Sequence, residues 1–99
     1  MGKLPSFDWH MAKAQGNLTK HGVAFEAVKG FEFDTALYVE DNRTEYGEVR
    51  VSATGFIGDR LHVLIFTLRE PDVVWVISLR KANRRESDRY VAFATPDEG

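Results

Sequence analysis

Three apolar runs joined by short links constrain the fold of this chain most. They read EVRVSATG at 48–55, RLHVLIFTLR at 60–69 and VVWVISLR at 73–80, and the links contain GD at 58–59 and EPD at 70–72. Runs rich in Val, Ile, Leu and Phe are typical of strands, and links this short join neighbouring strands in antiparallel order. The sequence therefore predicts a meander of three antiparallel strands.

The flanking segments predict helices and two further strands. FDW at 7–9 predicts a short strand, and the helix after it ends at Gly22, with Asp8 as a candidate cap. VAFEAVKGFEF predicts a second, shorter helix that ends near Gly30, TALYVE predicts a strand, and a last helix is expected over 81–93. This order predicts an α+β domain with helices on a meandering sheet.

The length and composition fit one small domain. The chain has 99 residues, 43% of them apolar, and no cysteine, which excludes a disulfide framework and a thiolate metal site. None of the apolar runs approaches the roughly 20 residues that span a bilayer. We expect a single domain over 1–99, with its core at 7–93 and a frayed tail at 94–99.

The net charge of -2 conceals an acidic segment and a basic one. Residues 32–48 contain six acids and one base, whereas residues 60–90 contain seven bases and four acids. A pI near 5.9 argues against broad, non-specific DNA binding. The acidic segment is either solvated surface or a surface for a basic partner.

The alternation of side chains along the meander gathers four polar residues. A turn at 58–59 places Glu48 opposite Arg69 and Arg50 opposite Thr67, with Cβ atoms about 5 Å apart in each pair. Two guanidinium groups in one cluster suit an anion such as a phosphodiester. A cross-strand ion pair between Glu48 and Arg69 is the structural alternative.

The last predicted helix carries one acid on its inward stripe. That stripe consists of Ala82, Glu86, Tyr90 and Phe93. Because a buried, unpaired carboxylate is costly, Glu86 should have a cationic or hydrogen-bonding partner. If the helix doubles back along the sheet, it carries Tyr90 towards Arg50 and Arg69. The cations at 80–89 are either a solvated helix face or a contact to a polyanion.

The three histidines are too scattered in sequence to suggest a metal site. His62 alternates with Leu64 and Phe66 and is therefore predicted to be a peripheral core residue. His21 has two interpretations: a partner of the helix dipole in the last turn, or a general acid or base.

Four motifs, in this order, resemble one known family. They are KHG-x-x-F at 20–25, GE-x-R at 47–50, T-x-R at 67–69 and RKA-x-x-x-E-x-x-x-Y at 80–90. With them the chain resembles the BrnT toxins of bacterial type II toxin–antitoxin systems. The resemblance implies a RelE-like fold, an antiparallel sheet with two N-terminal helices and one C-terminal helix. One departure is His10, which stands where the family usually has an acid that caps the first helix.

The resemblance also implies a function. BrnT toxins are cytoplasmic ribonucleases that inhibit translation, so the expected substrate is RNA, with no cofactor and no metal. The expected partner is a BrnA-like ribbon-helix-helix antitoxin, bound to the toxin in a heterotetramer. The toxin is expected to associate with DNA only through this antitoxin and not to associate with a membrane. Two alternatives are a non-catalytic toxin that binds a protein and an inactive co-repressor.

The residues that match the family motifs receive expected roles. The hypothesis is attack by an RNA 2′-OH on the adjacent phosphorus, giving a 2′,3′-cyclic phosphate without a metal. The reaction needs a base, an acid and cations for the phosphorane oxygens. The candidates are Arg50 and Arg69 for charge stabilisation, His21 or Glu86 as base, Tyr90 as acid or orienting group, Lys20, Arg80 and Lys81 for RNA binding, and Glu48 and Thr67 for orientation.

Overall fold

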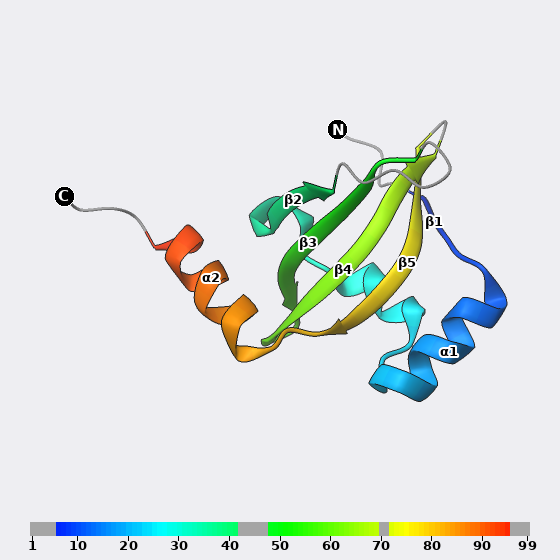
Figure 1. Ribbon diagram of the computed structural model, residues 1–99, viewed down its shortest axis with the longest axis horizontal. Helices are drawn as coiled ribbons and strands as arrows, with labels where there is room; N and C mark the ends of the chain where they lie inside the picture. Colours follow the sequence, from blue (N-terminus) through cyan, green and yellow to red (C-terminus); the bar gives the residue numbers. More distant parts are fainter. Residues whose placement is uncertain (1–5, 42–47, 70–71, 96–99) are drawn as a thin grey trace.

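The computed structural model describes residues 6–41, 48–69 and 72–95 of the chain. It forms one five-stranded sheet with the strand order β1-β5-β4-β3-β2 and helices around it (Figure 1). The elements are β1 Ser6–Asp8, α1 Met11–His21, the 3₁₀ helices η1 Phe25–Gly30 and η2 Phe33–Thr35, β2 Leu37–Asp41, β3 Arg50–Ile57, β4 Arg60–Arg69, β5 Val73–Lys81 and α2 Arg84–Ala94. The predicted α+β class is confirmed.

The sheet is mixed rather than wholly antiparallel. Strands β2 to β5 pair in antiparallel order, as the short links predict, but β1 pairs with β5 in parallel. Antiparallel order is imposed only where a short turn joins neighbouring strands. A long stretch of chain separates β1 from β5, so this edge strand is free of that constraint.

The predicted register of the β3–β4 hairpin is confirmed. Ala53 pairs with Leu64 and Phe56 with Leu61, and Gly58 has a φ of 63° in the turn. The turn requires this left-handed conformation, which glycine adopts without steric cost. The two-residue periodicity therefore assigns each hairpin side chain to one face.

The core lies on the face of the sheet that η1 covers. Phe25 and Val28 of η1 are fully buried, as are Leu64 and Leu79 of the strands. Figure 1 shows η1, in cyan, passing behind the strands. The predicted second helix is thus 3₁₀ rather than α, because Phe25, Val28 and Phe31 are all buried and the three-residue repeat of a 3₁₀ helix puts them on one side.

Helix α1 is fixed to the exposed edge of β5 by Asn17, a residue that the sequence did not single out. The side-chain amide of Asn17 donates to the Leu79 carbonyl (2.7 Å) and accepts from the Leu79 backbone N–H (3.2 Å). It also donates to the Val23 carbonyl at 2.9 Å. The amide thus continues the β5 ladder beyond the residues that pair with β1.

The ends of α1 match the prediction at one end only. Gly22 forms the C-terminal cap with a φ of 71°, as predicted. The N-terminal cap is His10 rather than Asp8, and the His10 side chain makes no capping hydrogen bond. Asp8 instead accepts from the Trp9 backbone N–H at 2.8 Å, because the helix begins two residues later than a cap at Asp8 requires.

Helix α2 begins later than predicted and does not reach the end of the sheet that carries Arg50 and Arg69. Asn83 and Glu86 form a reciprocal capping box, so the helix starts at Arg84 while Lys81 still belongs to β5. From there α2 runs beside β2 and the end of β3, at the end of the sheet opposite the start of β3 (Figure 1). Phe93 is 54% exposed, so its predicted place in the core is wrong.

None of the helices in the described part of the chain is long and apolar enough to cross a membrane.

Candidate functional site

A cavity lined by two arginines opens on the sheet face opposite the core, where β3 begins and β4 ends. We call it the arginine cavity; its volume is about 280 Å³. Its lining residues are His10, Lys13, Glu48, Arg50, Arg69, Trp75 and Ile77. The predicted pairing of β3 with β4 brings Arg50 and Arg69 to one cavity. Lys13 of α1 and His10, which directly precedes α1, also line it.

Arg69 is held in a defined orientation within the arginine cavity. Its Nε donates to Glu48 Oε2 at 3.0 Å and its Nη2 to Glu48 Oε1 at 3.4 Å. The guanidinium carbon lies 4.0 Å from the centroid of the Trp75 ring, a cation–π contact. Because the Arg69 and Glu48 side chains are 42% and 41% exposed, solvent screens the ion pair and it adds little to stability.

Thr67 links the two strands that carry the arginines, β3 with Arg50 and β4 with Arg69. It is 2% exposed, and its hydroxyl donates to the Val49 carbonyl at 2.8 Å. This bond ties the residues just before β3 to β4. Thr67 does not itself line the arginine cavity.

The predicted acid–base candidate His21 does not line the arginine cavity, whereas His10, which was not among the predicted candidates, does. His10 precedes α1 and His21 ends it, and an 11-residue helix is about 16 Å long. The expectation that His21 serves the Arg50–Arg69 pair is therefore not supported by the geometry. His62 is buried with its Nδ1 2.9 Å from the Arg60 carbonyl, which confirms its structural assignment.

Glu86 has the cationic partner that its position predicts. Arg80 Nη1 and Nη2 donate to the two Glu86 carboxylate oxygens at 2.8 and 2.7 Å, and the Asn83 backbone N–H donates at 2.9 Å. The hydrogen bonds from Arg80 hold the pKa of Glu86 below its usual value, against the opposing effect of burial. The same bonds raise the pKa of Arg80. A carboxylate engaged in this way is a poor proton acceptor.

Tyr90 lies away from the arginine cavity, which corrects the expectation that α2 brings it there. Its ring meets Phe56 edge to face at 5.6 Å, and its hydroxyl donates to the Thr35 carbonyl at 3.0 Å. Phe56 follows Arg50 by six residues in β3, about 20 Å along an extended strand. Buried and already bonded, Tyr90 holds α2 on the sheet.

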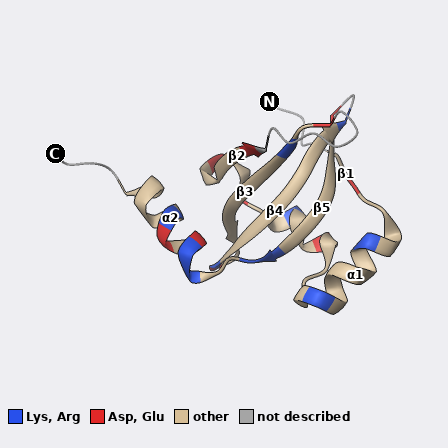
Figure 2. Ribbon diagram, viewed as in Figure 1, with Lys and Arg blue, Asp and Glu red and all other residues tan. Residues whose placement is uncertain are grey.

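The basic residues are spread over several elements. Figure 2 shows Lys and Arg at the start of β3, on α1, and separately at the end of β5 and along α2. Lys81 and Lys20 are exposed. The predicted pair of Arg84 and Asp88 is present at 4.0 Å, with both side chains largely exposed.

Among the described residues, no group of three or more His, Asp or Glu side chains is placed to hold a metal ion.

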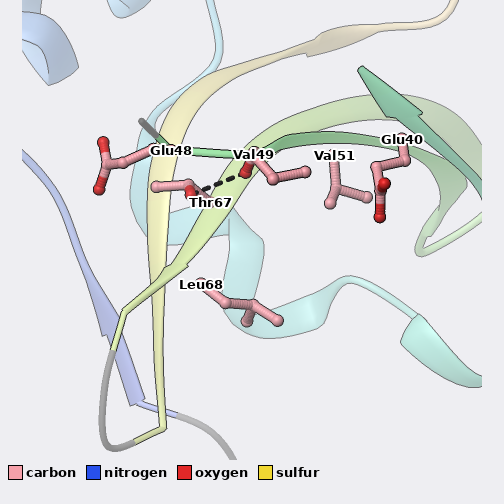
Figure 3. Close-up of a pocket in the computed structure, with 6 residues that line it drawn as sticks. All are labelled: Glu40, Glu48, Val49, Val51, Thr67 and Leu68. Atoms are coloured by element: carbon pink, nitrogen blue, oxygen red, sulfur yellow. Dashed lines mark hydrogen bonds between the residues drawn. The ribbon is translucent and has the colours of Figure 1, made fainter. Parts of the chain in front are cut away.

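A second cavity, of about 340 Å³, lies beside the first and has a different character. Figure 3 shows its lining residues, which are Glu40, Glu48, Val49, Val51, Thr67 and Leu68. Leu68 is 68% exposed. We call this acidic and apolar hollow the acidic cavity. Glu48 lines both cavities and so stands between them.

Four residues that line the arginine cavity were not predicted as site residues: His10, Lys13, Trp75 and Ile77. Trp75 faces Thr67 in the β4–β5 register, so its place follows only once that pairing is known. Lys13 comes from α1 and His10 directly precedes that helix, so their approach depends on how Asn17 docks α1. The one signal in the sequence was His10, an imidazole at a position that suits a capping acid.

Comparison with known proteins identifies the family. A family model described as "Ribonuclease toxin, BrnT, of type II toxin-antitoxin system" matches residues 9–86. Among solved structures, the Brucella abortus ribonuclease toxin BrnT matches with a TM-score of 0.64 and 26% sequence identity, over 82% of this chain and 100% of that one. A search of curated proteins gave no significant match. The chain therefore belongs to the BrnT family of ribonuclease toxins of type II toxin–antitoxin systems.

Proposed function

We propose that this protein is a metal-independent endoribonuclease that cleaves RNA and thereby inhibits translation, with its reaction centre in the arginine cavity. The observation that carries the proposal is the presence of two guanidinium groups, Arg50 and Arg69, in one open cavity of a ribonuclease-family chain. Guanidinium groups bind phosphate oxygens with two parallel hydrogen bonds and keep their charge at any physiological pH.

The chemistry requires negative charge to be stabilised as it develops. When the RNA 2′-oxygen attacks phosphorus, the charge on the non-bridging oxygens rises, and fixed cations lower the barrier. Glu48 and Trp75 hold Arg69 in place, so little reorganisation is needed. Arg80, Lys81 and Lys20 are assigned to RNA backbone contacts outside this centre. Each lies on a different part of the surface from the arginine cavity.

The proposal does not retain the expected roles of Glu86 and Tyr90 in catalysis. Both are engaged in contacts that fix α2 to the sheet, and neither lines the arginine cavity. His21 likewise lies at the far end of α1 from the cavity. We assign Glu86 and Tyr90 to folding.

Expression in a bacterium tests the proposed role of the arginines. Arg50→Ala and Arg69→Ala should each abolish growth arrest, because each removes a cation from the centre. Arg84→Ala is the matched control, since Arg84 is exposed and distant on α2. Circular dichroism of the purified variants checks that they fold. If either folded cavity variant stays fully toxic, the assignment is wrong.

The partner is proposed to be a BrnA-like ribbon-helix-helix antitoxin that forms a heterotetramer with the toxin and alone contacts DNA. Support comes from the acidic cavity, where Glu40 and Glu48 flank Val49, Val51 and Leu68 (Figure 3). Such a surface suits a segment that presents both basic and apolar side chains. Co-expression of the neighbouring gene should remove growth arrest.

Charge reversal tests the docking surface. Changing Glu40 and Asp41 to Lys should lower the affinity of the toxin for its antitoxin and make that affinity less dependent on salt concentration. The reason is that attraction to a basic partner is replaced by repulsion. Glu26→Lys, an exposed acid on η1, is the control for a general charge effect. A complex of unchanged affinity would exclude this acidic segment as the interface.

Two other functions predict different outcomes. A toxin that binds a protein target would arrest growth while the RNA pool stays intact. An inactive co-repressor would cause no arrest, with or without the antitoxin. Mapping of RNA ends after induction separates both from the proposed ribonuclease, which should produce new RNA ends.

A further inference from the structure

The arginine cavity is lined by one histidine, His10, and it is neither of the expected bases. We propose that His10 is the catalytic base of this site, with a neutral imidazole that takes the proton from the attacking 2′-OH of the RNA. The inference rests on the proposed function, because it names the proton acceptor of the same reaction.

The position of His10 places it among the groups that bind phosphate. It comes directly before α1, and with Lys13 one turn later it forms the α1 side of the cavity, facing Arg50 and Arg69 of the sheet. The charged groups that line the cavity with it are Lys13, Arg50 and Arg69, against the single acid Glu48. A phosphodiester is therefore drawn to the cavity that His10 borders.

The helix gives no structural reason for a histidine at this position. His10 is the N-terminal cap, and its carbonyl accepts the first helical bond from Ala14 at 3.0 Å. Its side chain makes no capping hydrogen bond, although Asp, Asn, Ser or Thr at this position would do so. The imidazole is exposed, which leaves its ring nitrogens accessible to a ligand in the cavity.

The other two histidines are unsuited to this role. His62 is buried, and its Nδ1 lies at hydrogen-bonding distance from the Arg60 carbonyl. His21 lies at the opposite end of α1, about 16 Å away along the helix axis. His10 is thus the histidine that shares a cavity with both arginines.

The reaction is balanced without any further reagent. A ring nitrogen of His10 takes the 2′-OH proton as the bond from the 2′-oxygen to phosphorus forms. The bond from phosphorus to the 5′-oxygen breaks, its electron pair stays on that oxygen, and water supplies the proton that completes the 5′-OH. The products are a 2′,3′-cyclic phosphate and a 5′-hydroxyl end, and the imidazolium returns its proton to solvent.

The experiment compares single-turnover cleavage of RNA by the wild type, His10→Gln and His21→Gln between pH 5 and 8. Loss of a general base typically lowers the rate by about 10²–10⁴-fold. We expect that loss in His10→Gln, together with loss of the rate increase with pH that a histidine base produces. His21→Gln should keep the wild-type rate and profile. Binding of an RNA with 2′-deoxyribose at the cleavage position should be similar in all three.

A second variant separates catalysis from folding. His10→Asn supplies a good helix cap but no imidazole, so it should unfold at a higher temperature than the wild type and still be inactive. If His10→Gln or His10→Asn cleaves at the wild-type rate with the wild-type pH profile, the inference is wrong while the proposed ribonuclease stands. If the wild type itself leaves RNA intact, the proposed function fails and this inference with it.

Discussion

Asn17 connects the helix that carries His10 and Lys13 to the sheet that carries the arginines. Only 8% exposed, it satisfies the Leu79 N–H and two backbone carbonyls with one side-chain amide. When a buried polar group loses such a partner, the folded protein loses stability, because no water molecule or other group replaces the lost hydrogen bond. The geometry of the arginine cavity therefore depends on a residue outside it.

Replacing Asn17 with alanine should lower the free energy of unfolding by about 2–4 kcal/mol, because at least one buried backbone group loses its partner. Gln15→Ala, at an exposed position of the same helix, is the control and should change stability by less than about 0.5 kcal/mol. Urea unfolding followed by circular dichroism measures both. Equal stabilities of the two variants would contradict the assigned role.

Glu86 gives a prediction for the pH dependence of stability. Its pKa in the folded protein is held below the unfolded value mainly by hydrogen bonds from Arg80. A lowered pKa adds stability that is fully present above the unfolded pKa, near 4.5, and is lost as the pH falls through the folded pKa. At neutral pH the Glu86→Gln variant should thus be less stable by about 1–3 kcal/mol.

Below the folded pKa this difference should disappear, because the wild-type carboxyl is then neutral as well. Asp88→Asn is the matched control: Asp88 lies 4.0 Å from Arg84 with both groups exposed, so its removal should cost less than about 0.5 kcal/mol. Thermal unfolding across pH 2–8 tests both. A stability gap for Glu86→Gln that is independent of pH would refute the account.

Among the elements, the β3–β4 hairpin was the most predictable from sequence. A two-residue turn with Gly58 fixes its register, and the alternation of side chains then assigns Glu48, Arg50 and Arg69 to their places. Local chemistry was sufficient here because each contact lies within one hairpin. The ion pair between Glu48 and Arg69, which the sequence left open as the structural alternative, is present at 3.0 Å.

The helices were less predictable because their directions depend on tertiary contacts. The capping box at Asn83 and the bond from Tyr90 to Thr35 send α2 away from the arginines, and neither follows from helical periodicity. The 3₁₀ form of η1 arises from the burial of three apolar residues at a spacing of three. His10 and Lys13 reach the cavity through the docking of α1, which no local pattern reveals.

Close packing between β3 and the segment after η1 gives a further prediction. A Cβ on Gly55 would lie 2.9 Å from Phe31 Cζ and 3.1 Å from Ala36 Cβ, closer than van der Waals contact allows. Gly55→Ala should therefore destabilise the protein by about 1–3 kcal/mol. Gly16→Ala is the control, since a Cβ there meets no atom within 4 Å and alanine favours the helix. Calorimetry should show a lower transition temperature for Gly55→Ala and a higher one for Gly16→Ala.

At the scale of the whole molecule, two of the basic regions have different assigned roles. One region is the arginine cavity, and the other is the group at the end of β5 and along α2, where Arg80 is engaged with Glu86 (Figure 2). The acidic cavity adjoins the first region through Glu48. An antitoxin bound there would lie next to the proposed reaction centre.

Cleavage of RNA by the purified protein in the presence of EDTA is the most direct test of the central claim. The account predicts fragments with 2′,3′-cyclic phosphate and 5′-hydroxyl ends, and losses of about 10²-fold or more for Arg50→Ala and Arg69→Ala. Lys81→Ala should mainly weaken RNA binding and its salt dependence. Two results would contradict a metal-independent centre in the arginine cavity. One is cleavage at the wild-type rate by both arginine variants, and the other is loss of cleavage by the wild type in EDTA.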